Sequence, residues 1–263
     1  MQDVYLIFIL IYNIVFMVIL MTSFLLKIIG IITMLSDHVG DAIIGHFSIL
    51  NLIGRIAFPI FAFQSVQGYM HTKNFKKYLF RLLVFAIVSQ VPFNLFLSTF
   101  TKDFALNIFF TFLFGLVSLF LYDKCKNKFI GLLAVIIISI IGELVKVDYG
   151  AFGILLIFNF YFFENEFDKL YNIPSIELFN KNISFKKFFM TIISIMLCFI
   201  RYIPNIMESP LLITHYLKCW LFTSLSLIFI LAYNQKQGSK LKYLFYIFYP
   251  LHLLILYFIN ISK

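Results

Sequence analysis

Lys27 and His38 are the two residues whose types and spacing most directly suggest chemistry. Eleven positions separate them, so on one helix both side chains would lie on the same face, about 16 Å apart along the axis. An imidazole can act as a general base, and a cation deeper in the same tunnel could neutralise an anionic group. In the alternative interpretation, Lys27 extends to the inner membrane interface while Asp37 and His38 end the helix among lipid headgroups. Spacing alone does not separate the two.

Arg55 is the next ionisable group within an apolar segment. Such groups are costly at membrane depth, so each is a functional candidate. Its position near the expected outer interface would allow an ion pair with Asp37 or Asp41 across two helices. Because Pro59 cannot donate a hydrogen bond to the carbonyl of Arg55, the sequence predicts a kink here, with Arg55 facing the protein interior.

Amides and a second imidazole in the apolar segments could line the same cavity. The candidates for this lining are Gln64, Gln67, Gln90, Asn94, Asn107 and His252. By themselves, Gln64 and Gln67 favour close packing between helices, since with Gly68 they form one narrow polar face. A single histidine within a helix, such as His252, is more often a hydrogen-bonded packing residue than a catalyst.

The remaining charged residues, the cysteines and the absence of known motifs give no sign of a metal site, a redox site or a hydrolase site. Glu143 and Lys146 are three positions apart and are expected to form a structural ion pair. Cys125, Cys198 and Cys219 are scattered without a C-x-x-C pair or metal-ligand spacing, so no disulfide framework, zinc site or redox chemistry is predicted. The sequence contains no Gly-rich phosphate loop, no G-x-S-x-G motif and no H-E-x-x-H motif.

The elements that must position these residues are membrane helices. Of 263 residues, 62% are hydrophobic and only 13% are charged, and the mean hydropathy is +0.97, which a water-soluble core could not absorb. Apolar runs of about 17 to 25 residues recur, as a bilayer of roughly 30 Å requires. These segments are 4–34, 49–70, 78–100, 104–122, 129–145, 151–163, 188–203, 217–233 and 243–261. The predicted fold is an all-α, polytopic integral membrane helix bundle with about nine transmembrane helices.

Basic residues predict the orientation of this bundle. Fourteen Lys and Arg residues fall in one set of alternate loops and five in the other, and such residues are retained on the cytoplasmic side. The loop after Met70 belongs to the richer set and is predicted to be cytoplasmic, while the loop with Asp41 and His46 is predicted to lie outside. The net charge of +9 comes mostly from the excess of Lys and Arg in the predicted cytoplasmic loops. No nucleic-acid partner is therefore predicted.

The first apolar segment is too long for one crossing and too short for two. Residues 1–20 have no basic n-region and no small-residue cleavage site, so they do not fit a secretory signal peptide. We expect the functional first helix to begin near Met21, with residues 1–20 as a hydrophobic extension or the product of a mis-set start codon. Residues 21–263 are expected to form a single transmembrane domain.

A series of ordered motifs runs from Lys27 to the C-terminus. They are Lys27 to Gly40, Gly54 to Phe63, His71-Thr72, Tyr78 to Leu83, Gln90 to Asn94, Asn107 with Thr111, Tyr149-Gly150 and Phe245 to Leu253. Together they resemble the TraX family, whose named member is a membrane protein of a conjugation system that N-acetylates the amino terminus of pilin. TraX proteins also resemble the acyltransferase type 3 class, whose first helix carries an Arg, ten residues and then a His. Lys27 stands in place of that Arg, which keeps the charge but loses the planar bidentate fork.

The resemblance implies a membrane-embedded acyltransferase in the cytoplasmic (inner) membrane. His38 would be the general base, and Asp37 or Arg55 would hold its environment. Acetyl-CoA from the cytoplasm would be the acyl donor. The acceptor would be a peptide or pilin amino terminus, or an envelope molecule, at the outer face.

The implied donor carries phosphates, which cations would bind. The candidates are Lys27, Lys76, Lys77 and Arg81, although the positive-inside bias alone explains the three that flank the cytoplasmic loop. Two other functions stay open. A transporter would predict inverted repeats, which the sequence does not display. A non-catalytic membrane assembly factor for a pilus or secretion system would need none of this chemistry.

Overall fold

The structure is a computed structural model of the 263-residue chain, and it describes residues 21–45, 48–167, 169, 185–239 and 242–262. Within these residues every regular element is a helix, and the only β contact is an isolated parallel bridge between Leu106 and Val147. The predicted all-α class is therefore confirmed. The expected extension at 1–20 and His46 lie outside the described residues.

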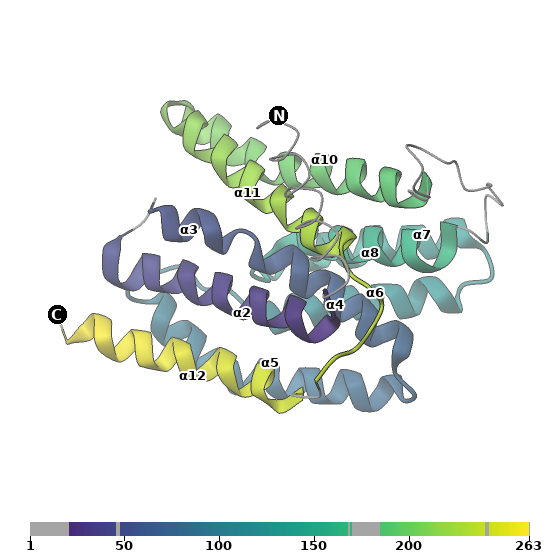
Figure 1. Ribbon diagram of the computed structural model, residues 1–263, viewed down its shortest axis with the longest axis horizontal. Coiled ribbons are helices and arrows are strands. Elements are labelled where there is room, and N and C mark those ends of the chain that lie inside the picture. The colour runs from purple at the N-terminus through teal and green to yellow at the C-terminus, as the bar shows by residue number, and fades with distance from the viewer. Residues whose placement is uncertain (1–20, 46–47, 168, 170–184, 240–241, 263) are drawn as a thin grey trace, which may run out of the picture.

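The helices follow one another with short connections. Their bounds are α2 Ser23–Val39, the π-helical η1 Gly40–Ile44, α3 Ile49–Gly54, α4 Ala57–His71, α5 Phe75–Leu97, α6 Ile108–Lys124, α7 Lys128–Leu144, α8 Gly150–Tyr161, the π-helical η2 Phe162–Glu166, α10 Phe185–Glu208, the 3₁₀ turn η3 Pro210–Leu212, α11 Ile213–Leu231 and α12 Lys242–Ile261. The long helices run roughly along the longest axis of the molecule (Figure 1).

Six helical stretches among the described residues are long and apolar enough to cross a membrane. They are Ser23–Ile44, Ile49–His71, Phe75–Leu97, Phe185–Glu208, Pro210–Leu231 and Leu244–Ile261. The predicted count of about nine is not supported. Helices α6 and α7 have 17 residues each and α8 has 12, which corresponds to about 25 Å and 18 Å, shorter than the roughly 30 Å hydrocarbon core. The chain is a multi-pass membrane protein, and in its described part the shorter helices α6, α7 and α8 accompany the six long stretches.

Side-chain caps explain where several helices begin. The hydroxyl of Thr22 accepts a hydrogen bond from the N–H of Leu25 at the start of α2. Asn107 caps α6 and Asn127 caps α7, each by accepting a backbone N–H two residues later. Because Asn107 caps α6, the predicted segment 104–122 forms a helix only from Ile108.

Helix α4 is the centre of the bundle. It packs against α2, α6, α8 and α11, and Ile60, Ala62 and Val66 are fully buried within it. By contrast, α5, α7, α10 and α12 expose rows of large apolar side chains, such as Phe80 on α5 and Ile140 on α7. Lipid tails would cover these outward faces.

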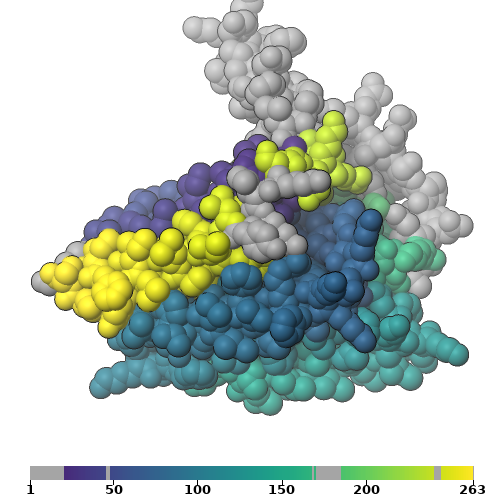
Figure 2. Space-filling view, turned by 90° about the horizontal axis from the view of Figure 1, so that it is seen from below, coloured from purple at the N-terminus to yellow at the C-terminus, as the bar shows by residue number. Residues whose placement is uncertain are grey.

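The C-terminal helix α12 packs against both α2 and α5, and so lies beside the first described helix of the chain. It packs most closely against α5 and makes smaller contacts with α2 and η1, and Figure 2 shows the yellow α12 between the purple α2 and the blue α5. This packing places the second half of α12 beside the end of α2, where His38 lies.

The predicted kink at Arg55 is confirmed. Helix α3 ends at Gly54 and α4 begins at Ala57, so Arg55 and Ile56 form a turn between two helical pieces. Pro59 falls in the first turn of α4, where the missing N–H breaks no helical hydrogen bond.

The predicted ion pair between Glu143 and Lys146 is absent from the part of the chain that the structure describes. Glu143 instead accepts a hydrogen bond of 2.8 Å from the backbone N–H of Ala151. Ala151 lies in the first turn of α8, where backbone N–H groups have no helical partner and a carboxylate is favourable. Capping the next helix therefore takes the side chain away from Lys146.

Candidate functional site

His38 on α2 contacts His252 on α12. Nδ1 of His38 lies 2.8 Å from Nε2 of His252, and the two ring planes are inclined by only 20° with their centroids 5.0 Å apart, so the rings meet edge to edge. The side chain of His252 is buried, with 4% of its surface exposed. Sequence reasoning placed His252 among amides lining a cavity, whereas the structure makes it the direct partner of the predicted base.

A backbone carbonyl and two aromatic rings hold this pair of histidines. Nδ1 of His252 lies 2.7 Å from the carbonyl oxygen of Phe248. The ring of Phe248 stacks on His252 with a centroid distance of 4.6 Å, and Phe96 lies edge-on to His38 at 5.2 Å. The orientation of both imidazoles is therefore fixed by their neighbours.

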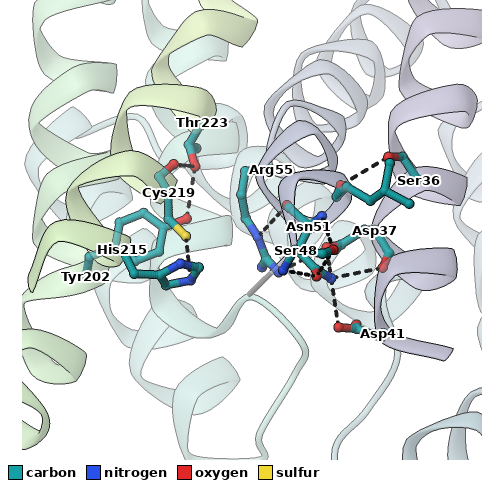
Figure 3. Close-up of polar contacts among 11 residues, drawn as sticks. Ser36, Asp37, Asp41, Ser48, Asn51, Arg55, Tyr202, His215, Cys219 and Thr223 are labelled. Atoms are coloured by element: carbon teal, nitrogen blue, oxygen red, sulfur yellow. Dashed lines mark hydrogen bonds and ion pairs between the residues drawn. The ribbon is translucent and has the colours of Figure 1, made fainter. Parts of the chain in front are cut away.

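Asp37 directs its carboxylate to a different neighbour from His38, because consecutive helical residues point about 100° apart. It forms an ion pair of 3.0 Å with Arg55, and is thus the partner among the two that the sequence allowed, Asp37 and Asp41. The amide of Asn51 donates to Asp37 at 3.2 Å and to Asp41 at 2.8 Å, and Figure 3 shows these carboxylates gathered around it. Asp37 and Arg55 thus form a cluster on the α3 side of α2, while His38 hydrogen-bonds on the α12 side.

A cavity of about 560 Å³ lies between α2, α4, α5 and α12. Its lining includes His71 and Thr72, at the end of the bundle that is predicted to be cytoplasmic. At greater depth the lining includes Met34 and Tyr249. These two residues come one helical turn before His38 and His252 respectively, so the cavity leads toward the histidine pair.

The cavity carries positive charge without a compensating carboxylate. Lys27 and Arg81 both line it, and none of its described lining residues is Asp or Glu. The ammonium of Lys27 lies 5.5 Å from the centre of the Phe245 ring, and the guanidinium of Arg81 lies 5.9 Å from that of Tyr246. Two cations in a partly apolar cavity, with no acidic residue in its described lining, suit an anionic ligand.

Three buried N–H groups of the lining find no hydrogen-bond acceptor among the described residues. They are the side-chain amides of Gln64 and Gln67 and Nε of Arg81. The carbonyl oxygen of Gln64 accepts a hydrogen bond of 2.6 Å from Ser23, so its amide nitrogen is the end left for the cavity. A buried donor without a partner costs roughly 1–3 kcal/mol. A ligand rich in acceptor oxygens would satisfy all three groups.

The comparison with known families agrees with the motifs in the sequence. Residues 23–260 match the family model described as TraX protein. The chain belongs to the TraX family. It is also 25% identical over 252 residues to the probable fimbrial assembly protein FimC, serogroup H1, of Dichelobacter nodosus, with 89% of this chain and 94% of that protein covered. No solved structure matches.

In this TraX-family protein, two of the predicted donor-binding lysines lie away from the cavity. Lys76 and Lys77 are exposed in the first turn of α5 and do not contribute to the lining. Arg81 does line it because it lies one turn further along α5 from Lys77.

The predicted amides Gln90, Asn94 and Asn107 do not line the cavity either. The amide nitrogen of Gln90 donates to Asn94 at 2.7 Å and to the carbonyl of Ala105 at 2.8 Å. Asn107 in turn donates to the side chain of Gln90 at 2.9 Å and to the carbonyl of Ala86 at 2.7 Å. These side chains join α5 to the segment before α6, and both amide hydrogens of Gln90 and of Asn107 are used in these bonds.

Sequence reasoning did not find the polar groups that face Arg55 from α10 and α11. Sγ of Cys219 lies 3.3 Å from Nε2 of His215, and Tyr202 hydrogen-bonds Thr223 at 2.9 Å. Figure 3 shows this second group across from Arg55. These residues come from two helices that are far from Arg55 in the sequence, so no local motif could have indicated that they lie near it.

Asp148 belongs to the same region, in the loop between α7 and α8. Burial raises the pKa of this carboxyl to about 6, although the positive charges of Arg201 and Arg55 oppose the shift. Arg201 stacks its guanidinium over the ring of Tyr149 at 5.4 Å. Asp148 in this loop therefore interacts electrostatically with Arg201 on α10 and with Arg55 in the turn before α4.

Proposed function

We propose that this TraX-family protein is a membrane-embedded acyltransferase that transfers an acetyl group from acetyl-CoA to an amine or hydroxyl at the outer half of the membrane. The observation that carries the proposal is the cationic cavity, whose described lining residues include no carboxylate and which leads toward the histidine pair. The acceptor that we favour is a peptide or pilin amino terminus. The fimbrial assembly protein that is similar over nearly the whole chain supports a role connected with pili.

The residues of the cavity fit a donor of this kind. Lys27 and Arg81 would bind phosphate oxygens, and the unpartnered N–H groups of Gln64 and Gln67 would donate to further acceptor atoms. The position of Lys27 about 16 Å below His38 on α2 suits a ligand with its anionic part at the cytoplasmic end and its reactive end near the histidines.

The chemistry requires one base. Acetyl-CoA supplies an acyl group as a thioester, so that the acyl carbon exchanges its bond to sulfur for a bond to the acceptor nitrogen or oxygen. His38 would take the proton from the acceptor as the new bond forms and return it to the departing thiol sulfur. Met34 and the aromatic lining of the cavity would limit access of water, which would otherwise hydrolyse the donor.

The test is acyl transfer in membranes that contain the protein. Vesicles are supplied with radiolabelled acetyl-CoA and a synthetic peptide with a free amino terminus, and the same peptide with a blocked amino terminus serves as the negative acceptor. The envelope fraction is assayed in parallel for label. We expect His38→Ala to lower transfer by on the order of 100-fold or more. His215→Ala, which removes a histidine outside the cavity and the pair, should retain activity. Undiminished transfer by a folded His38→Ala protein would sink the proposal.

A non-catalytic assembly factor is the second candidate, favoured by the name of the similar fimbrial protein. It predicts that a folded His38→Ala variant supports pilus assembly as well as the wild-type protein does. Counting pili on cells that express each variant separates the two functions.

A further inference from the structure

The hydrogen bond between His252 and Phe248 fixes the proton of the buried imidazole. A backbone carbonyl oxygen can only accept, so Nδ1 of His252 must carry the hydrogen in the 2.7 Å contact with Phe248. A neutral imidazole carries one proton, and Nε2 of His252 therefore presents a lone pair. The side chain is 4% exposed and stacked on Phe248, so an uncompensated charge there would be costly.

The tautomer of His252 determines that of His38 as well. The lone pair on Nε2 of His252 lies 2.8 Å from Nδ1 of His38. The contact is a hydrogen bond only if Nδ1 of His38 donates, since the opposite tautomer would place two lone pairs face to face. A neutral His38 with its proton on Nδ1 has its basic lone pair on Nε2. The carbonyl of Phe248 thus determines the donor in both hydrogen bonds: Nδ1 of His252 donates to Phe248, and Nδ1 of His38 donates to His252.

We propose that His252 is a positioning residue, which holds His38 in the tautomer whose Nε2 can accept the proton of the acceptor. The inference rests on the proposed function and adds a residue to it. The arrangement follows the logic of catalytic triads, in which a third group orients the base and stabilises its protonated form. Here a neutral imidazole with a backbone anchor takes the place that a carboxylate often has.

The pair needs no rearrangement when His38 takes up a proton. Its Nδ1–H already donates to His252, and the added proton occupies Nε2. The imidazolium of His38 therefore still donates from Nδ1 to the lone pair on Nε2 of His252. The fixed rings of Phe96 and Phe248 maintain this alignment. A base oriented in advance requires less reorganisation in the transition state.

Two substitutions of His252 distinguish positioning from packing. His252→Met fills a similar volume without an acceptor facing Nδ1 of His38, whereas His252→Gln can present its carbonyl oxygen near the former position of Nε2. We expect His252→Met to lower kcat by on the order of 100-fold, with KM for acetyl-CoA within twofold of wild type. The kcat of His252→Gln should be at least tenfold higher than that of His252→Met. Equal activity of the Met variant and wild type, or equal loss in both variants, would overturn the inference.

Nitrogen NMR of the ¹⁵N-histidine-labelled protein in detergent gives a readout that does not depend on activity. We expect the wild-type spectrum to show His38 with its proton on Nδ1, and His252→Met to move it to Nε2, the form that neutral imidazole favours in water. His38→Gln assigns the resonance. A wild-type His38 with its proton on Nε2 contradicts the inference even if the Met variant fails to fold.

The two proposals fail in different ways. If His38→Ala abolishes transfer but His252→Met does not, the acyltransferase stands and His252 is a packing residue. If His38→Ala retains transfer, the proposed function falls, whatever tautomer the spectra show.

Discussion

Gly54 on α3 lies directly against the backbone of Asp37 on α2. A Cβ at position 54 would overlap the Cβ of Asp37 and would be 2.8 Å from its Cα. The close approach of these two helices brings Arg55, the next residue, within reach of the carboxylate of Asp37. The glycine therefore sets the spacing of the cluster on the α3 side of α2.

We predict that Gly54→Ala destabilises the protein by about 1–3 kcal/mol, because the methyl group meets backbone and Cβ atoms that cannot turn away. Gly142→Ala is the matched control, since its added carbon would meet the terminal methyl group of Ile154, which can change rotamer. Thermal unfolding in detergent compares them. Equal melting temperatures for the two variants would contradict the assigned role of Gly54.

The cavity makes a prediction about donor affinity that does not require knowledge of the acceptor. Lys27→Met and Arg81→Met should each weaken binding of acetyl-CoA about tenfold, or about 1.4 kcal/mol, because each removes a cation from a lining without carboxylates. Calorimetry on the detergent-solubilised protein measures the Kd.

The double variant Lys76→Ala/Lys77→Ala is the control for charge alone. Both lysines are exposed and lie outside the cavity lining, and exposed charges are largely screened by salt. Their removal should leave Kd within twofold of wild type. A larger loss in this variant than in Lys27→Met would place the donor at the loop instead of in the cavity.

How much of the site the sequence could predict depends on whether a relationship is local. The shared face of Lys27 and His38 follows from helical spacing, and the break at Arg55 follows from Pro59, so both were accessible from the sequence. The partner of His38 was not, because spacing within α2 gives no information on which helix packs beside it. His252 comes next to it only through the placement of α12 between α2 and α5.

The sequence also could not show which of the buried amides line the cavity. Gln64, Gln67, Gln90 and Asn107 are alike in sequence, as amides within apolar segments. Only the first two line the cavity with donors that have no partner, whereas Gln90 and Asn107 satisfy each other. The start of α6 was likewise missed: the predicted segment begins at residue 104 and the helix at Ile108, since hydropathy does not reveal where an asparagine will cap a helix.

Asp148 provides a pH test of the loop between α7 and α8. Its pKa rises from 3.8 to about 6, chiefly because of burial, so the folded protein binds a proton at Asp148 more tightly than the unfolded chain does. The stabilisation from that proton is complete below pH 4 and is lost as the pH rises toward 6 and above. The difference corresponds to about 3 kcal/mol at most.

Asp148→Asn should remove this pH dependence, because a neutral amide of the same shape has no proton to lose. We expect the variant to match the wild type near pH 4 and to be more stable than it above pH 6.5, as measured by thermal unfolding in detergent across this range. Asp103→Asn, at an exposed position in the loop before α6, serves as the control and should leave the pH dependence in place. If Asp148→Asn is instead less stable than wild type at pH 7, folding favours the charged carboxylate, and the pKa of Asp148 is lowered and not raised. In that case its attraction to Arg201 and Arg55 outweighs the effect of burial.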